Sequence, residues 1–163
     1  MNYIIKKYPL TTGKNCMLAS IKDILNYYGI NIIESDLYFI CKGLCFTFNP
    51  ASKAKLISDR FDYDCYQYII ENVSAFFNCN MIFNYSLEDI QIKELLKNDI
   101  PVIVLMDPRI VPYNNRILNP VGHQEMHSTV LYGYDDNMQS YFVADATVAD
   151  DSGLISALWT SMD

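Results

Sequence analysis

The chain has 163 residues, of which 51% are hydrophobic and 19% are charged, and its net charge is −7. This length and composition exclude intrinsic disorder and predict a single folded domain over residues 1–163. The acidic balance argues against a nucleic-acid partner, which would need a basic stripe, and no apolar run is long enough to cross a membrane.

The N-terminus and the cysteine content predict a cytoplasmic protein. Residues 1–9 lack the apolar segment of a secretory signal. The five cysteines are an odd number, so they are better interpreted as reduced thiols than as a disulfide framework. We therefore expect neither a membrane partner nor a structural disulfide.

The first predicted helix covers residues 16–28. Before it, Pro9 keeps residues 1–12 extended, and residues 3–5 are expected to form an edge strand. Asn15 is expected to cap the helix, and Gly29 to follow it in the left-handed conformation. Apolar side chains at helical spacing predict one buried face, made of Met17, Leu18, Ile21, Ile24, Leu25 and Tyr28.

Cys16 lies in the first turn of this helix, where the backbone N–H groups point outward and the helix dipole is positive. That environment favours the thiolate, which is the form that attacks an acyl group. The alternative is that Cys16 is a small core residue, as most free cysteines are. Cys16 is therefore a candidate nucleophile that needs partners elsewhere in the chain.

The middle of the chain predicts two helices and a strand. Residues 34–41 have acidic residues first and apolar residues after them, which is the pattern of a short helix. Residues 43–48 are β-prone and end at an Asn-Pro turn signal. The helical spacing of apolar residues predicts a second helix over residues 66–77.

A further helix is predicted over residues 86–97, with Ser86 as its cap. Its expected buried residues are Leu87, Ile90, Leu95 and Leu96. The continuous apolar run over residues 102–106 predicts a central strand that is covered on both faces.

Residues 107–122 are expected to form a long irregular loop, and long loops in compact domains are often functional. Asp107, Tyr113 and Arg116 in this loop are candidates for a wall or lid of a substrate site. Asp107 is also a candidate to contact an amine, and the alternative is that it only keeps the loop soluble.

Residues 126–134 and 140–145 predict an antiparallel hairpin that turns at residues 135–138. Tyr134 is expected to pair with residue 138 or 139. Counting back along the two strands places His127 opposite residue 145 or 146.

This register brings the His127 imidazole within reach of the Asp145 carboxylate. Together with Cys16, the two residues predict a nucleophile, a base and an acid that orients the base. Taken singly, His127 and Asp145 are also ordinary polar residues at strand ends. The coincidence of all three positions favours the catalytic interpretation.

A metal site is the competing interpretation of the same residues, because Cys41 and Cys45, and likewise His123 and His127, are spaced i,i+4. Strand positions at that spacing are roughly 13 Å apart, which is too far to share one ion. Gly43 also breaks a helix between the two cysteines. We therefore expect no metal ligand set.

These residues and their order resemble the papain-like, C39-peptidase-like proteins, and within them the N-terminal domain of butirosin biosynthesis protein H and its relatives. The resemblance implies an α+β fold in which the N-terminal helix carrying Cys16 packs on an antiparallel sheet carrying His127 and Asp145. The matching segments run in order along most of the chain: Asn15-Cys16, residues 24–30, Glu34, Leu37-Tyr38, residues 42–46, Met106-Asp107, residues 111–113, His127, residues 133–135 and Asp145.

The resemblance also implies a thiol acyltransferase, or amide synthetase, of natural-product (antibiotic) biosynthesis. Such a protein takes an acyl group from a carrier-protein thioester, holds it on Cys16 as nucleophile, and passes it to an amine. His127 would be the base and Asp145 the orienting acid. The implied partners are an acyl or peptidyl carrier protein with its phosphopantetheine and a small amine or diamine; no other cofactor is implied. Small amide synthetases of the closthioamide type are similar in these respects.

Two features depart from the family pattern. Relatives of the butirosin type have a second domain, whereas this chain ends soon after Asp145, so we expect a minimal form. Peptidases of the wider clan place a glutamine shortly before the cysteine to complete the oxyanion hole, and residues 9–15 contain none. We expect the Cys16 backbone N–H and a group of Thr12 or Asn15 to replace it.

The net charge bears on both implied partners. An acidic surface suits a cationic amine. Carrier proteins are themselves acidic, so their docking would need a local basic patch, for which the candidates are Lys6, Lys7, Lys14, Lys53 and Lys55.

Two other functions remain open at this point. One is a C39-like cysteine peptidase or acyl hydrolase, in which water is the acceptor, although the missing glutamine argues against a standard peptidase. The other is a non-catalytic papain-like binding module, for which replacing Cys16 would leave function intact.

Overall fold

The computed structural model describes residues 2–41, 47–48, 56–57, 66–107, 126–149 and 155–162. These residues form four helices and seven strands, which confirms the predicted α+β class. They divide into two compact units: residues 1–32 with 86–163, and residues 33–85. The single domain expected over residues 1–163 stays a prediction.

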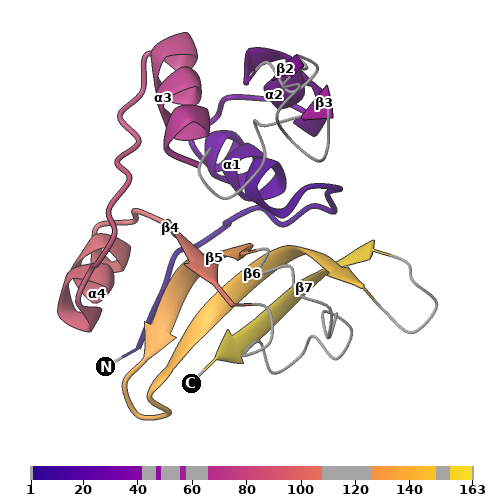
Figure 1. Cartoon of the computed structure of the whole chain (residues 1–163). Helices are drawn as coiled ribbons and strands as arrows, with labels where there is room; N and C mark the ends of the chain where they lie inside the picture. The colour runs from indigo at the N-terminus through magenta and orange to yellow at the C-terminus, as the bar shows by residue number, and fades with distance from the viewer. Residues whose placement is uncertain are drawn as a thin grey trace. The chain divides into compact units, whose positions relative to one another are not determined.

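An antiparallel sheet is the base of the larger unit (Figure 1). Its strand order is β1–β5–β6–β7, and β4 also pairs with β5. Because β6 occupies one edge of β5, β1 and β4 share the other edge, at opposite ends of β5. The strands are β1 (Asn2–Ile4), β4 (Val102–Met106), β5 (His127–Asp135), β6 (Ser140–Ala149) and β7 (Ile155–Met162).

One of the two strands predicted at this sheet has the expected position, and the other does not. The expected edge strand near residues 3–5 is confirmed as β1. The expectation that residues 102–106 form a central strand is wrong, because β4 pairs only with β5 within the described ranges. Its apolar run is explained by partial cover, since Val102, Ile103 and Val104 all pack against the core. The β7 strand was not predicted.

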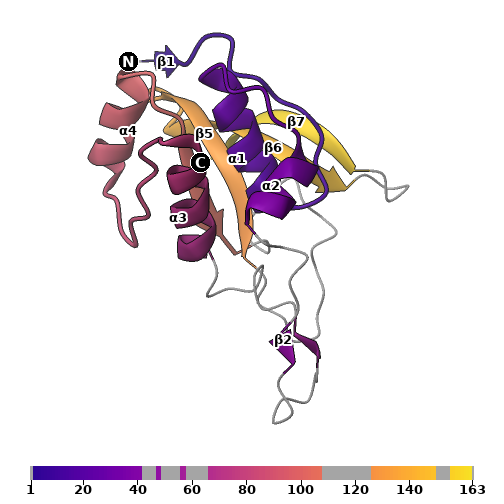
Figure 2. The same ribbon diagram turned by 90° about the horizontal axis from the view of Figure 1, so that it is seen from above.

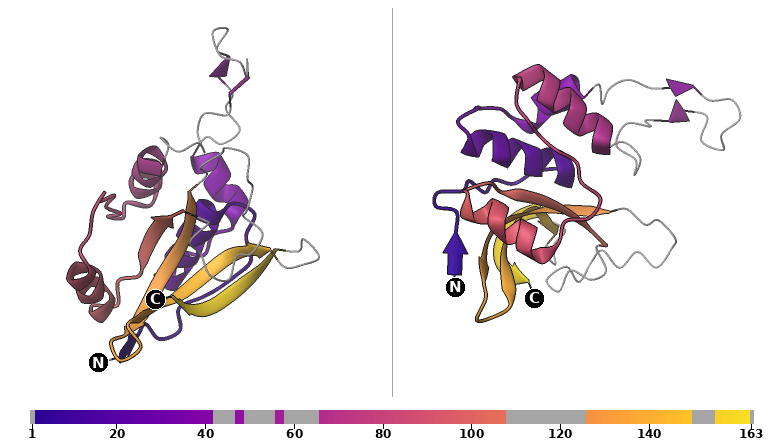
Figure 3. Two further views of the ribbon diagram at one scale, coloured as in Figure 1. Left: turned by 60° about the horizontal axis from the view of Figure 1, so that its bottom comes forward. Right: turned by 90° about the vertical axis from the view of Figure 1, so that its left-hand side faces the viewer.

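Helix α1 (Cys16–Tyr27) lies over β5 and β6 (Figure 2), and the side view in Figure 3 shows it above the sheet. Asn15 caps it as predicted, since its Oδ1 accepts the Leu18 N–H at 3.0 Å. Gly29 follows with φ +82°, also as predicted. The expected apolar face is buried except for Tyr28, which is 55% exposed because it follows the last helical residue.

Helix α4 (Asp89–Lys97) packs against β1, β4 and β5. The expected Ser86 cap is wrong: the helix begins after Glu88, whose backbone N–H donates to Gln91 Oε1 at 2.8 Å. Because the helix starts later than expected, Ile90 falls in its first turn and is 74% exposed, contrary to the prediction. Leu96 is fully buried, as predicted.

One buried cluster joins α1, α4 and the sheet. It contains residues that follow β1 and residues of α1, α4, β5 and β6, so both helices and the sheet share one core. Its members are Ile5, Tyr8, Ile24, Leu96, Val130, Leu131, Tyr134, Val143 and Ala144.

The smaller unit contains α2 (Glu34–Ile40), α3 (Tyr66–Phe77) and an antiparallel pair, β2 (Thr47–Phe48) with β3 (Leu56–Ile57). Both helices were predicted, and they contact each other. Of the strand expected over residues 43–48, only β2 lies within the described residues. No helix in the described part of the chain is long and apolar enough to cross a membrane.

The predicted hairpin is present as β5 and β6, but its register differs. Tyr134 pairs with Tyr141, so the expected pairing of Tyr134 with residue 138 or 139 is wrong. The reason is that β5 runs one residue further than expected and the turn is residues 136–139. An irregularity near the middle of β5 then shifts the pairing by one, and the paired stretch ends at Val130 and Ala144.

Gly133 lets β1 lie close to β5 because it has no side chain. A Cβ added there would clash with the Tyr3 backbone oxygen, so β1 would have to move. We expect Gly133→Ala to lower the free energy of unfolding by about 1–3 kcal/mol, measured by urea denaturation followed by circular dichroism. Met138→Ala, in the exposed turn, is the control and should match the wild type. Wild-type stability of Gly133→Ala would contradict this β1 placement.

Candidate active site

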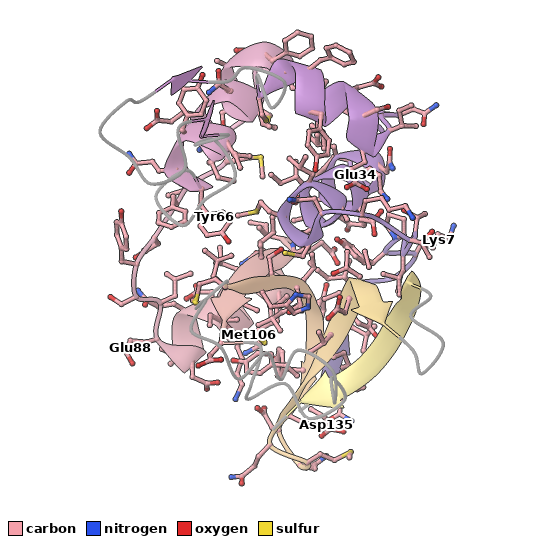
Figure 4. All side chains as sticks on the ribbon, turned by 45° about the vertical axis from the view of Figure 1, so that its right-hand side comes forward. Lys7, Glu34, Tyr66, Glu88, Met106 and Asp135 are labelled. Carbon is pink, nitrogen blue, oxygen red and sulfur yellow. The ribbon has the colours of Figure 1, made fainter. Side chains whose placement is uncertain are left out.

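The candidate site lies at one end of the sheet in the larger unit. Cys16 is the first residue of α1, and His127 is the first residue of β5. Met106, at the end of β4, pairs with His127, while Asp135 marks the opposite, turn end of β5 (Figure 4). The site is therefore built where α1 begins and where β5 emerges.

A buried hydrogen bond joins His127 to Asp145. The His127 Nε2 lies 2.6 Å from Asp145 Oδ2, and the two side chains are 6% and 0% exposed. The contact predicted from sequence is thus present, although the register that led to it was wrong. Because the ladder ends at Val130 and Ala144, His127 and Asp145 meet beyond the paired stretch rather than directly across it.

The second oxygen of Asp145 is also engaged. Asp145 Oδ1 accepts the Thr147 backbone N–H at 3.0 Å and lies 3.4 Å from the Thr147 hydroxyl. With both oxygens bonded, the carboxylate is fixed in orientation, which in turn fixes the imidazole. Sequence reasoning missed Thr147; its only signal was a hydroxyl residue two positions after a buried acid.

The His127 ring is held in its charged form. Burial lowers the pKa of His127, but hydrogen bonds and charge from Asp145 and Cys16 raise it more, to about 9. Since Nε2 faces Asp145, Nδ1 is the nitrogen left for the thiol.

Cys16 is half-buried, and the pKa of its thiol moves in the opposite direction to that of His127. Burial raises the pKa of the Cys16 thiol, but hydrogen bonds to His127 and Ser128, with the charge of His127, bring it below its ordinary value. Both shifts favour a thiolate at Cys16 beside an imidazolium at His127. A thiolate is nucleophilic without further activation, and the imidazolium carries a proton for a leaving group.

Two charges on α1 hold the segment that precedes Cys16. The Asp23 carboxylate accepts the Thr11 backbone N–H at 3.1 Å and the Thr11 hydroxyl at 2.6 Å. The Lys22 Nζ donates to the Thr12 backbone oxygen at 3.0 Å and lies 3.7 Å from Asp23. Both charged side chains are buried, so each is compensated by the other and by the segment it binds.

The same segment is tied to the strand that carries Asp145. The Gly13 backbone N–H donates to the Ala146 oxygen at 2.9 Å. The helix that begins at Cys16 and the strand that carries Asp145 are thus linked through residues 11–13. Sequence reasoning missed this link, although two adjacent charges, Lys22 and Asp23, inside a mostly apolar helix were a usable signal.

The remaining predicted residues have different positions. Thr12 is exposed and its carbonyl is bound by Lys22, while Asn15 uses its Oδ1 as the helix cap, so their oxyanion role stays a prediction. Asp107 is half-buried and follows Met106, the partner of His127, so it lies beside the site. Tyr113 and Arg116 of the same loop lie outside the described residues.

The metal interpretation finds no support in the part of the chain that the structure describes. No group of three or more histidine, cysteine, aspartate or glutamate side chains there could hold a metal ion. Cys41 is a buried free thiol whose pKa burial raises to about 11. His123 and Cys45 lie outside the described residues.

The fold and this cysteine–histidine–aspartate arrangement define a papain-like cysteine enzyme. Residues 15–146 match the family described as "Butirosin biosynthesis protein H, N-terminal", and the chain belongs to that family. The structure is similar to that of a protein from Bacillus anthracis described as a C39-like peptidase. The TM-score is 0.60 at 15% identity, covering 98% of this chain and 88% of that one. No curated protein matches the sequence.

The thiolate at Cys16 can be tested by its alkylation rate as a function of pH. In the wild type, we expect iodoacetamide to alkylate Cys16 rapidly at pH 7, because the thiol pKa lies below its ordinary value of 9.0. His127→Ala removes the charge and hydrogen bond but leaves the burial, so alkylation at pH 7 should fall about tenfold or more and recover above pH 9.

Peptide mapping by mass spectrometry measures this rate at Cys16, with Cys41 in the same sample as a buried internal control. An unchanged pH profile in His127→Ala would contradict the ion pair between Cys16 and His127.

The His127–Asp145 pair also predicts how stability depends on pH. Since the folded-state pKa of His127 is raised from 6.5 to about 9, its contribution is fully present below pH 6.5 and is lost as the pH rises through 9. The unfolding free energy of the wild type should exceed that of Asp145→Asn most near pH 6. The difference should shrink towards pH 10 in urea titrations.

Glu71→Gln is the control for this experiment. It changes a carboxylate that accepts a hydrogen bond from the Gln67 side-chain amide at 2.9 Å, and an amide does not titrate. Its effect should therefore be constant over pH 6–10. A constant effect of Asp145→Asn as well would show that His127 is not protonated in the folded protein.

Proposed function

We propose that the chain is an amide-forming cysteine acyltransferase, which moves an acyl group from a carrier-protein thioester to an amine through an acyl-Cys16 intermediate. The observation that carries this proposal is the Cys16–His127–Asp145 array, with its 2.6 Å imidazole–carboxylate bond. The name of the matched family, which refers to biosynthesis, favours group transfer over proteolysis. The lack of a glutamine in residues 9–15 favours it too.

In the first step, the Cys16 thiolate attacks the carbonyl carbon of the acyl thioester. The new C–S bond forms as the carbonyl oxygen takes up negative charge. When the intermediate collapses, the bond to the donor sulfur breaks, and His127 gives its proton to the departing thiolate. The products are acyl-Cys16, a neutral His127 and a free donor thiol.

In the second step, the amine attacks the acyl-Cys16 carbonyl while neutral His127 accepts its proton. The C–N bond forms, the C–S bond to Cys16 breaks, and Cys16 departs as a thiolate. This leaves the same thiolate–imidazolium pair with which the cycle began. Asp145 keeps the ring oriented through both proton transfers, as its buried bonds to His127 and Thr147 allow.

Helix geometry supplies a donor for the oxyanion. Cys16 is the first residue of α1, so its backbone N–H has no acceptor within the helix. The positive end of the helix dipole also favours negative charge at this position. We assign this N–H as one oxyanion donor; the clamped segment of residues 11–13 borders it.

The surface charge supports a cationic acceptor, since the net charge is −7. For the carrier protein, Lys6, Lys7 and Lys14 are exposed in the larger unit and could contribute to a docking patch. The other two lysines considered for that patch, Lys53 and Lys55, lie outside the described residues.

Intact-mass spectrometry with a panel of acyl thioesters tests the proposal. We expect the wild type to gain the mass of the acyl group and Cys16→Ala to gain none. Adding a diamine should then remove the acyl mass and yield the amide, because the amine attacks acyl-Cys16.

Two other outcomes separate the competing functions. Release of the free acid at the same rate with and without amine would indicate a hydrolase. A wild type that forms no Cys16 adduct with any thioester of the panel, including carrier-bound ones, would favour a non-catalytic binding module.

A further inference from the structure

A second residue on β5 reaches the Cys16 sulfur. Ser128, the neighbour of His127, is only 1% exposed. Both its hydroxyl and its backbone N–H form hydrogen bonds with the Cys16 side chain. The sulfur therefore has a set of contacts that does not involve the imidazole, and the mechanism described above does not use them.

The Ser128 hydroxyl is placed by a second buried serine. Ser20 Oγ lies 3.4 Å from Ser128 Oγ, and Ser20 is 3% exposed. Ser20 and Cys16 are one turn apart on α1, so they lie on the same helix face. Ser128 thus faces both residues across the contact between α1 and β5.

The surroundings of this serine pair are closed to solvent. Ser20 and Ser128 are 3% and 1% exposed, and Leu105 of β4, which pairs with Ser128, is half-buried. A buried hydroxyl needs a hydrogen-bond partner, and a thiolate is a stronger acceptor than a neutral hydroxyl. The Ser128 proton is therefore expected to point to Cys16 whenever the sulfur is ionised, and to Ser20 when it is not.

We propose that Ser128 is a catalytic residue that donates hydrogen bonds to the Cys16 thiolate, and that Ser20 positions its hydroxyl. This role in turnover rests on the proposed function. In that function the sulfur is an anion at two points: when it attacks the acyl donor, and when it leaves after the amine has attacked. Ser128 stabilises the anion at both points without consuming the proton that His127 transfers.

This division of tasks matters most in the second step. There His127 is receiving the proton of the amine while the C–S bond breaks, and the departing sulfur needs a donor that is already in place. A pre-positioned donor costs no reorganisation at that moment. The two hydrogen bonds from Ser128 meet this requirement, because strand β5 and Ser20 hold them.

The pH dependence of Cys16 alkylation by iodoacetamide tests the contact without any assumption about the substrate. We expect Ser128→Ala to move the midpoint of the profile upward by about one pH unit, since a hydrogen bond to a charged group is lost. Ser20→Ala should move it in the same direction by less, because the Ser128 hydroxyl is kept but is no longer oriented. In a His127→Ala background, Ser128→Ala should still raise the midpoint.

Thr129→Val is the matched control. Thr129 is the next residue on β5, is fully buried, and has a hydroxyl without a hydrogen-bond partner in the described structure. Its isosteric replacement removes a buried hydroxyl from the same strand and should leave the midpoint unchanged. Thermal melting of all three variants shows whether each is folded, and Ser20→Ala keeps the test valid if Ser128→Ala unfolds.

Wild-type midpoints in both Ser128→Ala and Ser20→Ala would overturn the proposal. Equal upward shifts in Thr129→Val and Ser128→Ala would also overturn it, because they would indicate a general effect of the strand. A shifted midpoint together with no acyl transfer by the wild type would retain the Ser128 contact and reject the proposed function. The two inferences therefore fail separately.

Discussion

The bond between His127 and Asp145 is the constraint on which the site depends. Both side chains are buried, so an unpaired charge on either would be costly, and each charge is tolerated only because the other is present. The carboxylate is fixed by Thr147. Burial lowers the pKa of the imidazole, but the carboxylate and Cys16 raise it more, to about 9. The charged ring in turn helps to lower the pKa of the Cys16 thiol. The shift at the sulfur thus depends in part on a carboxylate that is fully buried.

The fold supplies this constraint by joining two parts of the chain that are far apart in sequence. The hairpin of β5 and β6 carries His127 and Asp145, and α1 begins at Cys16. Lys22 and Asp23 fix the segment before α1, and Gly13 bonds to Ala146 beside the acid. A small displacement of the helix would therefore be resisted by polar bonds as well as by the shared core.

Local patterns in the sequence predicted individual elements well where one physical rule dominates. The cap at Asn15 and the left-handed Gly29 depend on neighbouring residues only, and both are present. The predicted register of the hairpin was wrong because the register depends on the position of the turn. Several turn-forming residues lie in a row there, so the sequence allows more than one position. The predicted contact between His127 and Asp145 is nevertheless present, because side chains near a strand end can meet without being directly opposed.

By itself, the sequence determined the class of fold, the helix that begins at Cys16, and the identity of the three residues that the site brings together. Those features depend on periodicity, on caps and on residue types that can be read from a short window. Only the tertiary structure decided that β4 pairs with β5 alone among the described residues, that Thr147 fixes the Asp145 carboxylate, and that Ser128 reaches the sulfur. Each of these depends on which distant backbone lies alongside, and no local pattern records that.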